Sequence, residues 1–310
     1  MAAAAGVEIP GTLRALMAKV GPRWAADVSG NVRLMVDSFD PVLARAPKQG
    51  VEVTRDIAYG DHPRQQLDVY VPTGIGAAQC DVAIFVHGGA FVDGHRNRSA
   101  EIYANVLYYL ARHGVIGVNI EYRLAPEFQY PSGIEDVALA VAWTQANVAR
   151  FGGDPARIVL IGHSAGAAHA AGYAYGERAI NRSAPRLAGL IVLSGRVRAD
   201  NAPDNPNARK VEAYYGTDSK RFDERSPVTG VDADSVRTMI AFAEFENPLL
   251  DIHCLELAWR LARAQRRAPP VLRLEGHNHT SLIAHINTSE DRLGHAMLAF
   301  IAGGGPRGGS

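Results

Sequence analysis

The chain has 310 residues, 47% of them hydrophobic and 21% charged, which is typical of a globular protein with one main domain and insertions. Lys plus Arg equals Asp plus Glu at 32 each, so the net charge is zero; this balance argues against nucleic-acid binding and fits a neutral substrate. No run of about 18 apolar residues occurs, which predicts no transmembrane helix and no membrane partner. The first residues do not resemble a secretory signal, and the two cysteines, Cys80 and Cys254, favour a reducing, cytoplasmic compartment.

Apolar residues at helical spacing predict two helices within residues 1–45, separated at Gly21 and Pro22. From residue 51 onward, short apolar runs alternate with helical segments. This alternation predicts an α/β fold with a mostly parallel sheet and helices on both faces. Strands are predicted at 51–59, 66–71, 82–86, 115–120, 157–162, 187–193, 238–245 and 271–274, and helices at 132–151, from 164, at 252–267 and at 290–301.

One polar stretch, residues 196–234, interrupts this alternation. It is rich in Asn, Pro, Asp and charged residues, and an irregular insertion of this length predicts a lid or cap. We therefore expect an N-terminal helical cap segment at 1–45, a main α/β domain at 46–302 that includes the lid, and a disordered Gly-rich tail at 303–310. The cap segment and the lid together would roof a pocket over the sheet.

The strongest local motif is Gly162-His163-Ser164-Ala165-Gly166, which lies between a predicted strand and a predicted helix. A strand, a sharp turn and a helix are the context in which a G-x-S-x-G elbow exposes a nucleophilic serine. Glycines two residues either side of the serine relieve clashes in such a turn. The motif predicts Ser164 as a nucleophile, and the N–H of Ala165 as a donor to a developing oxyanion.

A second motif, His87-Gly88-Gly89-Ala90-Phe91, follows the strand predicted at 82–86. Consecutive glycines allow backbone N–H groups to turn toward a substrate, so Gly88 and Gly89 are predicted oxyanion donors. His87 is interpreted as a structural hydrogen-bonding residue.

The base that activates the serine is expected after the last strand, where two histidines compete. His279 is the preferred candidate and His277 the alternative. A metal site that also includes His285 is a weaker reading, because no carboxylate–His helix motif accompanies these residues. No metal and no cofactor are therefore predicted.

The acid that orients the base is expected at the end of the strand 238–245. Glu246 is preferred because it lies at the carboxyl edge of that strand, where catalytic groups collect in parallel sheets. Asp251 is an alternative, but its expected place at the N-cap of the next helix already explains a carboxylate. Glu244 is a third candidate.

These motifs, in this order, resemble the hormone-sensitive-lipase-like branch of the α/β-hydrolase superfamily, and the strand at 67–72 is similar to one in kynurenine-formamidase-like esterases. The resemblance covers residues 51–302 and rests on four motifs: 87–91, Glu121-Tyr122-Arg123-Leu124-Ala125-Pro126-Glu127, Gly152-Gly153-Asp154-Pro155-Ala156-Arg157-Ile158 and 162–166. It implies an eight-stranded sheet, an N-terminal helical cap, no cofactor and hydrolysis of short acyl esters.

The sequence departs from this family at two places. Ala90 occupies the position of a third glycine, and Glu246 stands where the family has Asp, followed by an inserted Asn247. His279 follows Gly276 by three residues, which is the spacing of the family's histidine.

The function predicted is that of a serine carboxylesterase that hydrolyses short-chain esters through an acyl-enzyme formed by Ser164, Glu246 and His279. An amidase or formamidase with the same triad is the alternative, because leaving-group preference depends on the cap. A non-catalytic small-molecule receptor on this fold is a remoter alternative, because such receptors lack the histidine. Tyr214 and Tyr215 in the lid are candidate walls of a short acyl pocket. The sequence leaves open whether the protein forms a homo-oligomer.

Overall fold

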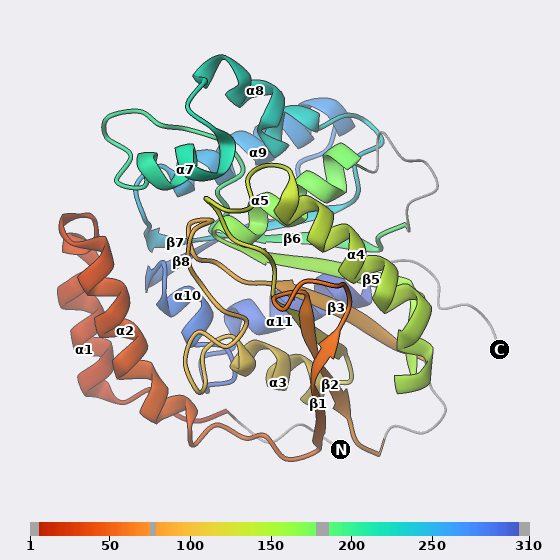
Figure 1. Cartoon of the computed structure of the whole chain (residues 1–310). Helices are drawn as coiled ribbons and strands as arrows, with labels where there is room; N and C mark the ends of the chain where they lie inside the picture. Colours follow the sequence, from red (N-terminus) through yellow and green to blue (C-terminus); the bar gives the residue numbers. More distant parts are fainter. Residues whose placement is uncertain (1–5, 75–78, 178–185, 304–310) are drawn as a thin grey trace.

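The computed structural model describes residues 6–74, 79–177 and 186–303; the predicted disordered tail at 303–310 lies, except for Gly303, outside this part. Eight strands form one sheet in the order β1-β2-β4-β3-β5-β6-β7-β8 (Figure 1). β2 is antiparallel to β1 and β4, and every other neighbouring pair is parallel, which confirms the predicted fold. The strands are β1 (Val51–Ala58), β2 (Gln66–Pro72), β3 (Cys80–Val86), β4 (Ile116–Ile120), β5 (Gly153–His163), β6 (Gly189–Leu193), β7 (Thr238–Phe245) and β8 (Val271–Asn278).

The central strands β3, β4 and β6 are mostly apolar and are buried along their whole length, because helices cover both faces of the sheet. On one face, α3 (Ala104–Arg112) and α11 (Arg292–Ala302) pack together with the N-terminal helices; on the other face lie α4 (Ser132–Asn147), α5 (Ala165–Gly172) and α9 (Leu250–Gln265) (Figure 1). The two hydrophobic cores therefore lie on opposite sides of the sheet. None of the helices in the described ranges has the length and apolar character needed to span a membrane.

The N-terminal segment contains α1 (Gly11–Val20) and α2 (Val28–Leu43), with a 3₁₀ turn at Gly21–Ala26 where the sequence predicts a break. Gly21 lies against the ring of Phe245, and a Cβ at this glycine would lie 2.3 Å from that ring. Asp27 caps α2 by accepting a hydrogen bond from the N–H of Gly30 at 2.9 Å. The segment is thereby fixed against the end of β7.

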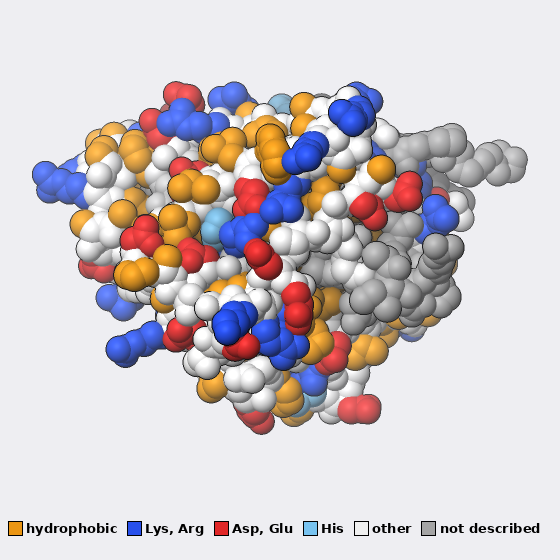
Figure 2. Space-filling view, turned by 90° about the horizontal axis from the view of Figure 1, so that it is seen from above, with side chains coloured by type: hydrophobic (Ala, Val, Ile, Leu, Met, Phe, Trp, Pro, Cys, Tyr) orange, Lys and Arg blue, Asp and Glu red, His pale blue; other side chains and the backbone are white. Residues whose placement is uncertain are grey.

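The insertion at 196–234 forms two short helices, α7 (Ala208–Tyr215) and α8 (Phe222–Arg225), above α9 (Figure 1). Arg198 fixes it to the body of the protein, because its guanidinium donates to Glu256 on α9 at 2.6 Å and to Asp223 at 2.7 Å. Basic and acidic side chains are interspersed over the face seen from above in Figure 2, in keeping with such surface pairs. The insertion is therefore a packed layer on α9.

Several elements differ from the sequence predictions; among them, β5 begins at Gly153 and the short helix α10 (Ser281–Ala284) was not predicted. Helix α3 was not predicted, β8 continues past residue 274 to Asn278, and α9 begins at Leu250. Because α9 begins two residues early, Asp251 lies inside its first turn, and the predicted N-cap role of Asp251 is wrong: the N-cap residue is Leu249.

Candidate active site

Ser164 lies between β5 and α5 with φ 56° and ψ −119°, outside the conformations that a serine ordinarily adopts. The flanking glycines make this turn sterically possible. A Cβ at Gly162 would lie 2.4 Å from Cα of Ala167, and one at Gly166 would lie 2.2 Å from the carbonyl oxygen of Val86. The turn places Ser164 at the first residue before α5, where the N–H of Ala165 opens the helix and its positive end faces the serine.

Glu246 and His279 are hydrogen-bonded to each other at 2.7 Å, from Nδ1 of the imidazole to Oε2 of the carboxylate. The Glu246 side chain is only 3% exposed and accepts three further hydrogen bonds, from the hydroxyl of Ser194 and from the backbone N–H groups of Ala243 and Asn247. Four donors hold the carboxylate in one orientation. The imidazole is consequently held with Nδ1 on the acid and Nε2 available to another partner.

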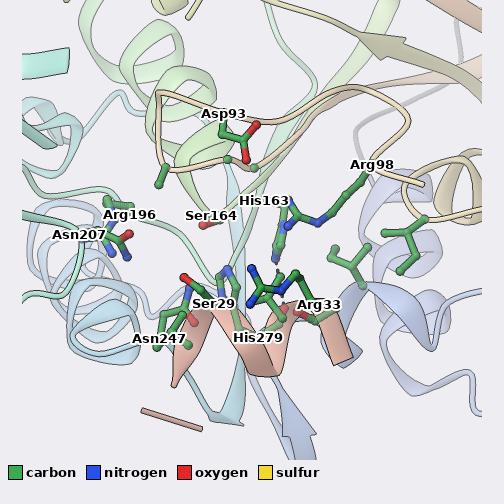
Figure 3. Close-up of a pocket in the computed structure, with 18 of the residues that line it drawn as sticks. Ser29, Arg33, Asp93, Arg98, His163, Ser164, Arg196, Asn207, Asn247 and His279 are labelled. Carbon is green, nitrogen blue, oxygen red and sulfur yellow. Dashed lines mark hydrogen bonds between the residues drawn. The ribbon is translucent and has the colours of Figure 1, made fainter. Parts of the chain in front are cut away.

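Ser164 and His279 border the same cavity, which has a volume of about 290 Å³ (Figure 3). Among the described residues, no hydrogen bond joins the Ser164 hydroxyl to the imidazole. Contacts between nucleophile and base are often long in proteins without substrate and shorten when substrate binds. Residues of α2 and of the insertion line the cavity beside the two catalytic candidates, among them Val28, Val32, Asn207 and Lys210.

His163, the residue before Ser164, supports the base. Its Nε2–H donates to the backbone carbonyl of His279 at 3.3 Å, and the two rings lie 4.7 Å apart. Burial, together with the neighbouring His279, lowers the pKa of His163 well below its usual range, so the ring is neutral. Its Nδ1 contacts the hydroxyl of Tyr103 at 3.3 Å.

The loop after β3 borders the cavity with Gly88, Gly89 and Ala90. The N–H of Gly88 donates to the hydroxyl of Tyr103 at 3.3 Å, so this predicted oxyanion donor already has a partner. At Gly89, φ is 153° and a Cβ would lie 1.7 Å from the carbonyl oxygen of Asp93, so only glycine fits. Ala90 has φ 51°, the left-handed conformation that explains a glycine there in the resembling family.

His87 is buried beneath this loop, as the structural reading predicts. Its ring nitrogens lie 2.8 Å from the carbonyl oxygen of Gly88 and 2.7 Å from Oε1 of Glu121. Burial alone would raise the pKa of Glu121, but His87, Arg96 and Arg64 outweigh burial and lower it to about 2. A buried charged network therefore anchors the oxyanion loop.

The alternative site residues lie elsewhere. His277 contacts Ser281 at 3.1 Å and Glu290 at 3.0 Å, and burial lowers the pKa of its neighbour His285 to about 3. Glu244 accepts a hydrogen bond from the N–H of Gly276 at 2.8 Å. The described ranges hold no group of three or more His, Cys, Asp or Glu residues arranged to bind a metal ion.

Tyr214 and Tyr215 do not line the cavity, which corrects their assignment as pocket walls. Both are buried in a cluster with Phe91, and the Tyr214 and Phe91 rings stack 4.8 Å apart. Because Phe91 directly follows Ala90, these tyrosines pack the insertion onto the oxyanion loop.

Several contributors were missed by sequence reasoning. The hydroxyl of Ser194 donates to Glu246, and the hydroxyl of Tyr103 accepts from the N–H of Gly88 in the oxyanion loop. Trp24 donates a 2.7 Å hydrogen bond to the side chain of Asn247, which directly follows Glu246. Arg196, in the loop that follows β6, lines the cavity. None belongs to a short motif, so the only signal for them is that Ser194 and Arg196 follow the carboxyl end of a strand.

Comparisons with known proteins find esterases among the proteins that this chain resembles. Residues 67–190 match the family model BD-FAE. Esterase LipC of Mycobacterium tuberculosis is 45% identical over 112 residues, which are 36% of this chain and 27% of that protein. A probable isoprenylcysteine alpha-carbonyl methylesterase of Oryza sativa subsp. japonica is 38% identical over 116 residues, 37% of this chain and 26% of that protein.

The chain thus matches about a quarter of the length of these curated relatives. Among solved structures, a bacterial heroin esterase superposes with a TM-score of 0.70 at 23% identity and covers 93% of each chain. At this identity the superposition shows the fold. Together with the topology and the elbow, it shows that the chain has the α/β-hydrolase fold.

Proposed function

We propose that the protein is a serine carboxylesterase that hydrolyses short-chain esters through an acyl-enzyme. The observation that carries this proposal is that His279, hydrogen-bonded to Glu246, lines one cavity with Ser164 at the carboxyl ends of β5 and β8. The esterase relatives in the superfamily support the same reaction class. Two buried cysteine thiols support the accompanying proposal of a cytoplasmic location.

In the proposed reaction, the Ser164 oxygen attacks the ester carbonyl while Nε2 of His279 takes the hydroxyl proton. Glu246 holds the imidazole and stabilises its charged form. The N–H groups of Gly89 and Ala165 bind the oxyanion, with Gly88 a third donor if it leaves Tyr103; each donor is worth about 3 kcal/mol of the barrier. His279 then protonates the leaving alcohol, and water, activated by the same base, releases the acid.

Short acyl chains are proposed because a cavity of about 290 Å³ lies at the lower end of the range for small-molecule sites. A panel of p-nitrophenyl esters with two to twelve carbons, and matching anilides, tests both chain length and bond type. The proposal expects kcat/KM to be highest at six carbons or fewer. Faster turnover of the anilides would favour the amidase alternative.

Ser164→Ala tests the nucleophile directly. A fluorophosphonate should label Ser164 in the wild type, and the variant should lose both labelling and ester hydrolysis with an unchanged circular dichroism spectrum. Full hydrolysis by the variant, or labelling of another residue, would overturn the proposal.

A further inference from the structure

The cavity beside Ser164 is lined unevenly with charge, although the whole chain is neutral. Four cationic side chains border it, and Asp93 is the one carboxylate among its described lining residues. The four are Arg33, Arg98, Arg196 and Lys210. A cleft lined mainly by one sign of charge concentrates ligands of the opposite sign. The neutral overall composition therefore conceals a cationic site, and a neutral substrate no longer follows from it.

Arg196 differs from the other three in burial. It is only 2% exposed, whereas Arg33 and Lys210 are exposed. Within the described ranges, its guanidinium makes no hydrogen bond and no ion pair, and its Nη1 atom is completely buried without a partner. Burial lowers the pKa of Arg196 to about 10, which still leaves the side chain charged at neutral pH. Asp200 and Glu246 favour the charged form without pairing with the guanidinium, so this buried charge is left with room for an anionic ligand.

The backbone places this charge next to the reaction centre. Arg196 is the third residue after β6, and its N–H donates to the carbonyl oxygen of Ser164 at 3.0 Å. Figure 3 shows Arg196 and Asn207 together on one side of Ser164, with Arg98 and Arg33 on the other side. The cavity thus reaches from Ser164 to a guanidinium and an amide.

We propose that the ester substrate carries a carboxylate, which Arg196 binds with Asn207 as a neighbouring donor. This inference rests on the proposed esterase function and specifies its substrate class. The planar guanidinium matches a carboxylate with two parallel hydrogen bonds, and exclusion of water strengthens the pair. Among the described residues, none pairs with the Arg196 guanidinium, so the substrate anion displaces no partner there and completes the site.

The test compares esters that differ only in one charge. Monoethyl adipate is paired with ethyl hexanoate to place the charge on the acyl side, and 4-carboxyphenyl butyrate with its methyl ester to place it on the leaving group. In one pair, kcat/KM of the anionic member should exceed that of the neutral member at least tenfold. Arg196→Met should lower this ratio at least tenfold, and Arg196→Lys should give an intermediate ratio.

Arg209→Gln is the matched control, because Arg209 is an exposed arginine of α7 that does not line the cavity. For this variant, the ratio of kcat/KM for the anionic ester to kcat/KM for the neutral ester should equal that of the wild type. If neither pair prefers the anion, or if Arg196→Met leaves the ratio unchanged, the inference is overturned while hydrolysis of the neutral esters still supports an esterase.

A binding experiment separates this inference from the proposed function. In titration calorimetry, the Ser164→Ala protein should bind adipate. Adding Arg196→Met should weaken this binding at least tenfold. Inorganic phosphate should compete with adipate only weakly. Such binding, together with a wild type that hydrolyses none of the esters, would contradict the esterase and keep the carboxylate site. Absent binding, or stronger binding of phosphate, contradicts a carboxylate site.

Thermal melting checks for a purely structural role. Removing an unpaired buried charge should leave the melting temperature of Arg196→Met equal to or above that of the wild type. A lower melting temperature together with an unchanged substrate ratio would show that Arg196 serves the fold. If the methionine variant does not fold, Arg196→Lys carries the same comparison.

Discussion

Tyr214 and Phe91 stack with their ring planes 5° from parallel, which joins the insertion to the oxyanion loop. Phe91 is held at φ 73°, so the loop conformation depends on this packing. Tyr214→Ala should destabilise the protein by about 3–5 kcal/mol in urea unfolding, because it removes a buried aromatic ring. Its kcat on p-nitrophenyl butyrate should fall as well.

Tyr214→Phe is the control for this variant. Within the described ranges the buried Tyr214 hydroxyl makes no hydrogen bond of good geometry, and only the backbone of Gly133 lies near it, so its removal should leave stability and kcat nearly unchanged. A wild-type kcat in Tyr214→Ala, measured where it is folded, would show that the insertion does not support the loop.

The identity of the acid can be tested with two amide substitutions. Glu246→Gln should lower kcat on the order of a hundredfold or more, because the imidazole loses the charge that orients and stabilises it. Asp251→Asn should leave kcat unchanged and cost a few tenths of a kcal/mol of stability, since Asp251 acts only at the positive end of α9. If Asp251→Asn lowers kcat and Glu246→Gln leaves it unchanged, Asp251 is the acid.

Ser194 is expected to act as a positioning residue for Glu246, to which its hydroxyl donates a hydrogen bond. Ser194→Ala should lower kcat by about tenfold and leave KM nearly unchanged, because three other donors still hold the carboxylate. The pH profile of kcat should move with the loss, since the carboxylate becomes a stronger acceptor for the imidazole. An unaltered kcat and pH profile would mean that the backbone donors suffice.

The buried Glu121 predicts a specific pH dependence of stability. Its folded pKa of about 2 lies below the ordinary value of 4.5, so its stabilising effect is complete above pH 4.5 and is lost as the pH falls toward 2. Glu121→Gln should be less stable than the wild type by about 3 kcal/mol at pH 7, and the difference should shrink between pH 5 and pH 3. Urea unfolding at each pH measures it.

Glu52→Gln provides the reference for that series, because Glu52 is exposed on β1. It should follow the wild type at every pH. A constant gap between Glu121→Gln and the wild type from pH 7 to pH 3 would contradict the charged network beneath the oxyanion loop.

Sequence reasoning succeeded where a residue's position follows from local backbone geometry. The glycines around Ser164 require a turn between strand and helix, so the location of the serine followed from the motif. The pairing of Glu246 with His279 is less local: a register shift between β7 and β8 sets Phe245 opposite Asn278 and brings the two side chains together. That shift lies beyond residue 274, where no apolar pattern predicts that the strand continues.

Arg196 could not be predicted as a cavity residue, because an arginine at the start of a polar insertion is ordinarily solvated. Its burial depends on packing by segments that are distant in sequence, and composition does not report such packing. The prediction that Tyr214 and Tyr215 line the pocket was wrong for a related reason: buried aromatic residues fill a core more often than they line a site.

The hydrogen bond between Trp24 and Asn247 has a consequence for substrate entry. Trp24 belongs to the segment that continues into α2, whose residues border the cavity, while Asn247 directly follows the acid. A movement of that segment wide enough to admit a bulky ester would stretch this bond and pull on the loop that carries Glu246. Opening of the cavity and alignment of the acid are therefore coupled equilibria, so a ligand that holds the cavity open should also lower the fraction of molecules with an aligned base.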